Sequence, residues 1–140
     1  MKNAPSILRV VIDTNVFVSS IVFGGKPRKL IDMIADDVLT LITAQEFLTE
    51  IRRIIVAKFP NFLEDFVKIE KLLELDAVWI CLGSVTVNVS RDVDDNKFIE
   101  AALIGDCNYI VSGDKDLLEL KEYNGIKIVS INEFLQLFSN

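Results

Sequence analysis

The chain has 140 residues, of which 51% are hydrophobic, and it carries a formal net charge of −6 and no histidine. A chain of this length is expected to form one domain, residues 1–140, with a sizeable core. The acidic balance disfavours binding of nucleic acid by overall charge alone, and the lack of histidine excludes histidine-based nucleophilic catalysis and histidine-ligated zinc.

Strands and helices are predicted to alternate along the whole chain. The expected strands are short runs rich in Val, Ile and Leu, at residues 8–12, 38–43, 78–82, 109–112 and 126–130. The expected helices show apolar residues at helical spacing or a capping residue, at residues 15–23, 27–37, 44–58, 62–75, 96–104 and 115–120, with a closing helix that ends at residue 138. This alternation predicts an α/β fold, a three-layer α/β/α sandwich built from right-handed βαβ units.

Polar residues are expected to cap several of these helices, and one further segment is expected to be extended. Asn61 precedes the helix at 62–75, Asp94 or Asp95 precedes the helix at 96–104, and Asn132 precedes the closing helix. Residues 85–89 alternate valine with polar residues, which predicts a short extended piece beside the third strand.

Neither a membrane helix nor a secretion signal is recognisable. No apolar run reaches the length of a membrane span, and Arg9 and Asp13 bracket too short an apolar segment for a signal peptide. We therefore expect a cytoplasmic protein without a membrane partner.

Two of the predicted strands run directly into an aspartate. Asp13 follows the strand at residues 8–12, and Asp114 follows the strand at 109–112 after Gly113. In an open α/β sheet the carboxyl ends of the strands share one edge, where ligands bind. The topology can therefore bring together two carboxylates that are about 100 residues apart in sequence.

Further acids stand where they could join these two. Glu50 lies near the border of the apolar face of its predicted helix. Near the start of two other predicted helices lie Asp92, Asp94 and Asp95, before residues 96–104, and Asp116, in residues 115–120. Carboxylates gathered without a histidine, and without an obvious lysine in these motifs, repel one another unless they are protonated or bind cations. Oxygen ligands suit Mg²⁺ or Mn²⁺, and one or two such ions can activate water for in-line attack on a phosphodiester.

These motifs resemble the PIN-domain family, metal-dependent ribonucleases that include many prokaryotic toxins of toxin–antitoxin pairs. The matching segments, in the family's order, are residues 11–16, 48–51, 91–103 and 109–118. The closest likeness is to the subgroup described as toxin components. The resemblance implies a parallel sheet of about five strands in the order 3-2-1-4-5, with strands one and four side by side. It also implies an RNA substrate, an antitoxin partner and a homodimer.

The resemblance also assigns roles to individual residues. The catalytic carboxylates would be Asp13, Glu50, Asp114 and one of Asp94 and Asp95, with Asp95 favoured because the family's third acid directly precedes a helix. The metal ligands would come from this set, with Asp116 as an outer ligand. The supporting hydrogen-bonding residues would be Thr14, Asn15, Asn96 and Ser112. Apart from the resemblance, Lys115 directly follows Asp114 in the sequence, so we expect it to contact substrate phosphate.

Other interpretations stay open beside this one. Asp94 or Asp95 alone could be a helix cap, Asp92 a turn residue and Glu50 a surface glutamate. Two other functions also fit in part. One is a haloacid-dehalogenase-like phosphatase, although Asn15 stands where that chemistry needs a second aspartate. The other is a catalytically inactive interaction module with a PIN fold.

Overall fold

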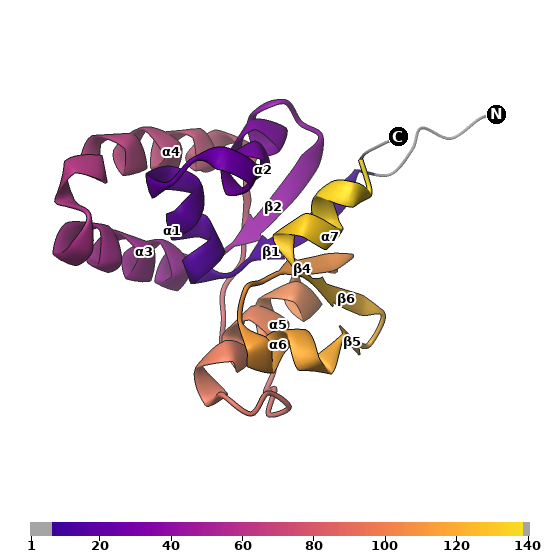
Figure 1. Cartoon of the computed structure of the whole chain (residues 1–140). Coiled ribbons are helices and arrows are strands. Elements are labelled where there is room, and N and C mark those ends of the chain that lie inside the picture. The colour runs from indigo at the N-terminus through magenta and orange to yellow at the C-terminus, as the bar shows by residue number, and fades with distance from the viewer. Residues whose placement is uncertain (1–6, 139–140) are drawn as a thin grey trace.

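The computed structural model describes residues 7–138, which form a six-stranded sheet flanked by helices (Figure 1). The strands are β1 (Leu8–Ile12), β2 (Leu39–Thr43), β3 (Val78–Trp79), β4 (Tyr109–Val111), β5 (Glu122–Tyr123) and β6 (Ile126–Val129). The α-helices are α1 (Thr14–Val22), α2 (Gly25–Ala35), α3 (Gln45–Lys58), α4 (Leu63–Asp76), α5 (Asn96–Ile104), α6 (Lys115–Leu120) and α7 (Ile131–Gln136). Two 3-10 turns, η1 (Pro60–Phe62) and η2 (Val93–Asp95), precede α4 and α5.

The order of the strands is β3-β2-β1-β4-β6-β5, and every pairing is parallel except that of β5 with β6. The predicted fifth strand corresponds to β6, so the predicted order 3-2-1-4-5 is correct. The chain runs outward from β1 through β2 to β3 and then returns to place β4 on the other side of β1. The direction of winding therefore switches between β1 and β4, where an open α/β sheet has its binding crevice.

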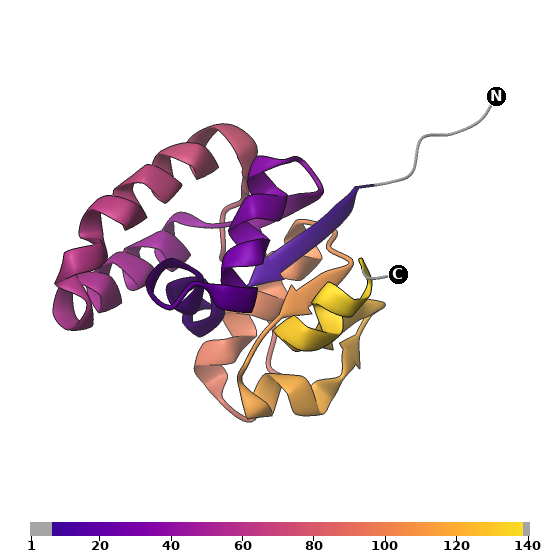
Figure 2. The ribbon, with the colours of Figure 1, turned by 45° about the horizontal axis from the view of Figure 1, so that its top comes forward.

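The helices cover the sheet in the way that an α/β/α sandwich requires. Helix α1 contacts α2 and α3, and α5 packs against β1, β2 and β4. Helices α3 and α4 form a hairpin on one side of the sheet, away from β5 and β6, as Figures 1 and 2 both show. Among the described residues, none of the helices has the length and apolar character that crossing a membrane demands.

Strand β1 lies at the centre of the core, since Val10, Val11 and Ile12 are at most 4% exposed. Helix α3 buries the stripe that its sequence periodicity predicted, formed by Phe47, Leu48, Ile51 and Ile55. The aspartate that follows β1 is therefore attached to a closely packed strand in the core.

The chain between β3 and η2 differs from expectation. Strand β3 has only two residues, and residues 85–89 are not a strand but part of a loop. Val85 and Val89 are 38% and 39% exposed, so their alternation with polar residues does not reflect a buried face. Side chains hold this loop instead, because the backbone N–H groups of Val89 and Ser90 donate to Asn96 Oδ1.

One edge strand was not expected, and two predicted helix caps were wrong. Residues 122–123 form the edge strand β5, which pairs with β6. Helix α7 is capped by Ser130, which forms a capping box with Glu133, and not by Asn132. Asn61 lies inside η1, and α4 has no side-chain cap.

Gly105 allows α5 to pack closely on β2. A Cβ atom at Gly105 would lie 2.4 Å from Ile42 Cγ2 and 3.1 Å from the carbonyl oxygen of Ala101. We expect Gly105→Ala to lower the free energy of unfolding by about 1–3 kcal/mol, because an added methyl group in a packed interior forces shifts of the backbone or side chains. Urea denaturation measures this loss.

Gly113→Ala is the matched control for this substitution. A Cβ atom at Gly113 would lie 3.9 Å from Val16 Cγ2, which is an ordinary van der Waals contact. We expect this variant to stay within about 0.5 kcal/mol of the wild type. Equal losses in both variants would contradict the close packing of α5 against β2.

Candidate metal centre

Asp13 occupies the end of β1 and the N-cap of α1, and its side chain is 3% exposed. Its Oδ1 accepts from the backbone N–H of Val16 at 2.9 Å. Its Oδ2 accepts from Ser112 Oγ at 2.5 Å and from the backbone N–H of Gly113 at 3.2 Å. Burial raises the pKa of Asp13, and the nearby charge of Asp114 raises it further, while these three hydrogen bonds oppose the shift.

Asp114 stands just after β4, at the N-cap of α6. Its Oδ1 accepts from the backbone N–H groups of Asp116 at 2.8 Å and Leu117 at 3.4 Å. Ser112 connects it to Asp13, because Ser112 Oγ donates to Asp13 Oδ2 and accepts from the backbone N–H of Asp114. One fully buried hydroxyl therefore sets the positions of the residues that end β1 and β4.

Glu50 projects from α3, and both of its carboxylate oxygens have partners. Thr14 Oγ1 donates to Oε1 at 2.5 Å, and Lys97 Nζ donates to Oε2 at 2.9 Å. Burial raises the pKa of Glu50, but the hydrogen bonds from Lys97 and Thr14 and the positive charge of Lys97 outweigh it and hold the pKa below its usual value.

Asp94 and Asp95, between which the sequence did not decide, lie in different environments. Asp95 is 7% exposed, whereas Asp94 is exposed to solvent. Asp95 Oδ2 is buried and accepts no hydrogen bond. Burial and the negative charges of Asp114 and Asp92 raise the pKa of Asp95 to about 7. Asp95 is the N-cap of α5 by position, yet its side chain does not cap the helix.

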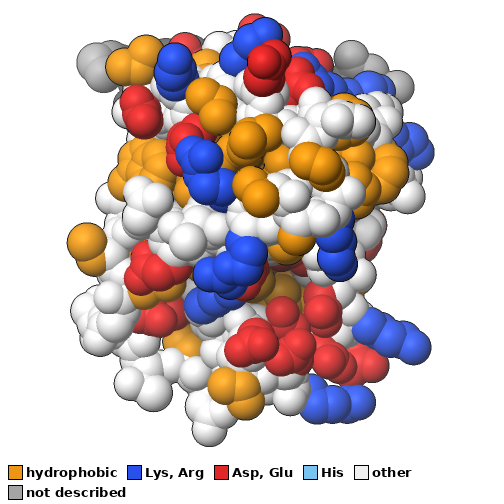
Figure 3. Space-filling view, turned by 90° about the vertical axis from the view of Figure 1, so that its left-hand side faces the viewer, with side chains coloured by type: hydrophobic (Ala, Val, Ile, Leu, Met, Phe, Trp, Pro, Cys, Tyr) orange, Lys and Arg blue, Asp and Glu red, His pale blue; other side chains and the backbone are white. Residues whose placement is uncertain are grey.

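Together these side chains line one cavity of about 160 Å³ at the carboxyl edge of the sheet. Its wall is formed by Asp13, Thr14, Asn15, Glu50, Ile54, Asp92, Asp94, Asp95, Lys97, Phe98 and Asp114. Figure 3 shows Asp and Glu side chains gathered into one patch on the face that it presents, with Lys and Arg side chains along its border.

Not every predicted residue lines the cavity. Asn96 is buried outside the cavity wall, and its Oδ1 holds the preceding loop by accepting from the backbone N–H groups of Val89 and Ser90. Lys115 is exposed and does not line the cavity. Asp116 lies outside the cavity wall, but one of its carboxylate oxygens lies within 4.8 Å of oxygens of Asp92 and Asp95.

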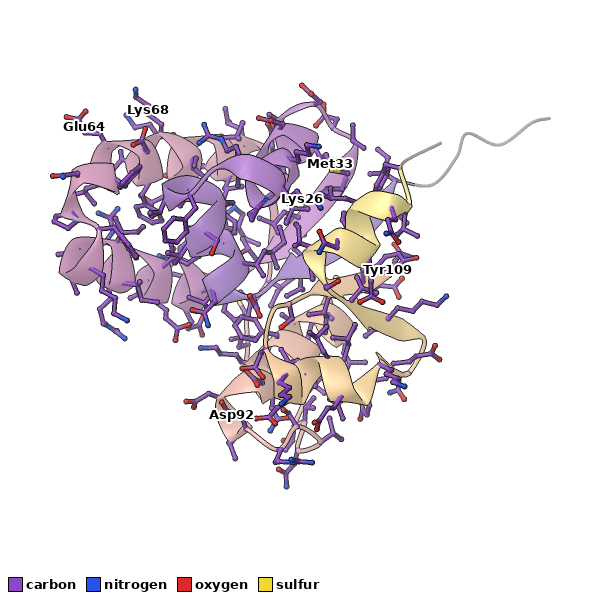
Figure 4. The ribbon with its side chains drawn as sticks, viewed as in Figure 1. Lys26, Met33, Glu64, Lys68, Asp92 and Tyr109 are labelled. Atoms are coloured by element: carbon purple, nitrogen blue, oxygen red, sulfur yellow. The ribbon has the colours of Figure 1, made fainter. Side chains whose placement is uncertain are left out.

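Two charged residues of the cavity wall, Asp92 and Lys97, were not assigned to the site from the sequence. Asp92 was considered among the candidate acids, with a turn residue as the alternative; it is exposed, and its Oδ1 accepts from the backbone N–H of Asp94 (Figure 4). Lys97 closely follows Asp95 in the sequence, but its partner Glu50 lies 47 positions away, so the sequence did not predict their contact.

Five of the six carboxylates on the cavity wall lack a basic partner. Within residues 7–138, no Lys or Arg forms a salt bridge with Asp13, Asp92, Asp94, Asp95 or Asp114. Asp13 and Asp95 are the buried members of this group, and a buried carboxylate must be neutral or meet a cation. An oxygen-only cluster suits Mg²⁺ or Mn²⁺, and the unpartnered oxygen of Asp95 is free to be a ligand.

Two comparisons with known proteins give matches over most of the chain. A family model described as "PIN domain" matches residues 9–116. The chain is also similar to an uncharacterized protein of Methanocaldococcus jannaschii, with 36% identity over 129 residues, which cover 89% of this chain and 81% of that protein.

The raised pKa of Asp95 predicts how the stability of the protein depends on pH in the presence of EDTA. The pKa of Asp95 is 3.8 in the unfolded chain and about 7 in the folded chain. Between these pH values the folded chain therefore keeps a proton that the unfolded chain has lost. The free energy of unfolding should therefore fall as the pH rises from 4 to 7. Asp95→Asn removes this contribution, so we expect the variant to gain stability relative to the wild type over that range.

Urea denaturation at several pH values measures the difference between wild type and variant. Asp94→Asn is the control, because Asp94 is adjacent in sequence but exposed. A difference between wild type and Asp95→Asn that stays constant from pH 4 to 7 would contradict the raised pKa.

Proposed function

The chain belongs to the PIN-domain family, and we propose that it is a Mg²⁺- or Mn²⁺-dependent endoribonuclease that hydrolyses RNA phosphodiesters. PIN domains are typically metal-dependent nucleases, so family membership indicates nuclease chemistry. The observation that carries the proposal for this chain is the buried oxygen of Asp95, which has no hydrogen-bond partner and lies among other carboxylates in one cavity.

We propose Asp13, Asp95 and Asp114 as the residues that hold the metal. Asp13 and Asp114 come from the ends of neighbouring parallel strands, and Asp95 comes from the start of α5. When bound there, a divalent cation would neutralise phosphate charge and lower the pKa of a water molecule. The other carboxylates on the cavity wall are those of Glu50, Asp92 and Asp94.

The other residues of the site would act by positioning these acids. Ser112 fixes Asp13 Oδ2 and the backbone of Asp114, and Thr14 fixes Glu50 Oε1. Such hydrogen bonds to metal-binding side chains orient them and remove the need to reorganise when substrate binds. Asn15 lies on the cavity wall and is exposed, so it can contact substrate.

RNA as substrate, the toxin role and the homodimer are supported by the likeness to the family. With a net charge of −6, the chain is expected to attract RNA through bound cations and through local basic residues and not through its overall charge. Lys97 lies on the cavity wall and Lys115 lies outside it, so Lys97 is the better candidate for a contact near the reacting phosphate.

We expect Asp13→Asn to lower Mn²⁺-stimulated cleavage of RNA by more than about 100-fold, because even outer-shell partners of metal ligands cost about 10–100-fold when they are lost. A single-turnover assay with end-labelled RNA measures the rate. The substitution keeps the size of the side chain, so circular dichroism should match that of the wild type.

The control is Asp65→Asn, an exposed acid on α4 that does not line the cavity. It should cleave at the wild-type rate. Equal cleavage by wild type and Asp13→Asn would overturn the proposed function. Phosphate release from p-nitrophenyl phosphate without RNA cleavage would support the phosphatase alternative instead.

A further inference from the structure

Lys97 gives the acidic cavity a positive charge of its own. Its Nζ atom lies 2.9 Å from Glu50 Oε2, and the two side chains are 27% and 32% exposed. Thr14 Oγ1 holds the other oxygen of the same carboxylate. Both oxygens of Glu50 are thus engaged, in contrast to Asp95, whose Oδ2 accepts no hydrogen bond.

The position of Lys97 on its helix needs an explanation. Lys97 lies in the first turn of α5, where the helix dipole disfavours a positive charge. Its side chain turns toward the cavity and lies over the ring of Phe98, with Nζ 5.2 Å from the ring centroid. The ion pair with Glu50 compensates for the unfavourable interaction of the lysine charge with the helix dipole. The contact with Glu50 in the acidic cavity therefore explains why a lysine stands at this position.

The ion pair separates Glu50 from the other five acids of the cavity wall. Glu50 already faces a cation, whereas Asp13, Asp92, Asp94, Asp95 and Asp114 form no salt bridge within the described part of the chain. A divalent cation bound directly to Glu50 Oε2 would have to displace Lys97 or lie against its ammonium group. Like charges at such a distance repel strongly in a partly buried site.

We propose that Lys97 takes the place of a second metal ion, so that the site binds one divalent cation, on Asp13, Asp95 and Asp114. This inference rests on the proposed function and specifies its metal stoichiometry. Lys97 would supply the second positive charge beside the substrate phosphate, and Glu50 would be a positioning residue that holds Lys97.

Isothermal titration calorimetry with MnCl₂ on the full chain tests the proposal. We expect one tightly bound Mn²⁺ per wild-type chain and two per Lys97→Met chain, because the substitution releases Glu50 while keeping a side chain of similar length. Lys97→Arg keeps the charge and should bind one ion. Lys68→Met is the matched control, because Lys68 is exposed on α4, far from Asp92 (Figure 4), and it should also bind one ion.

The double variant Glu50→Gln/Lys97→Met gives an independent test, because it removes the ion pair without changing the net charge. We expect it to bind one Mn²⁺ within about threefold of the wild-type affinity, well below the roughly 10–100-fold cost of disturbing a metal ligand. A loss greater than about tenfold would make Glu50 a direct ligand and overturn the proposal. This variant decides the question if Lys97→Met alone does not fold.

The possible failures are distinguishable. Two ions on the wild type, or one on both wild type and Lys97→Met, would overturn the role of Lys97 while the ribonuclease proposal stands. If the wild type binds no Mn²⁺, or if Asp13→Asn leaves Mn²⁺ binding unchanged, the proposed function is overturned. The proposed role of Lys97 then falls with it.

Discussion

The repulsion among carboxylates held at one edge of the sheet is the constraint on which the site depends. Asp13 and Asp95 are almost fully buried, and burial raises the pKa of each. Such groups cost stability unless the rest of the fold keeps them in place. Parallel pairing of β1 with β4 and the buried residues of β1 supply that rigidity, so the core stabilises an arrangement that the acids alone would oppose.

Several of these acids also have a structural role as helix caps. Asp13 is the N-cap of α1, Asp114 is the N-cap of α6 and Asp92 is the N-cap of η2, and each side chain accepts backbone N–H donors. Such hydrogen bonds favour the charged form of a carboxylate, and so does the positive end of a helix dipole. Burial and the negative charges of Asp114 and Asp92 raise the pKa of Asp95 to about 7, and no side-chain capping bond opposes this shift.

The sequence predicted the parts of this arrangement that depend on local patterns. Asp13 and Asp114 could be placed because each closely follows a buried strand, whereas the order of the five parallel strands, which was correct, came from the resemblance to the family. The edge strand β5 was missed because its two residues carry no periodic signal. The pairing of Glu50 with Lys97 could not be predicted, because it depends on how α3 and α5 approach each other across the cavity.

The unequal environments of the acids give them different functions within one cavity. Asp13 has three hydrogen-bond donors and cannot move without breaking them, so it fixes the centre of the site. Asp95 has a buried oxygen without a hydrogen-bond partner, which is the reason it is proposed as a metal ligand. Glu50 is committed to Thr14 and Lys97, so it contributes through the ammonium group that it holds. Acids that look alike in the sequence therefore differ in their hydrogen bonding: Asp13 is held in place, Asp95 has an oxygen without a donor, and the charge of Glu50 is balanced by Lys97.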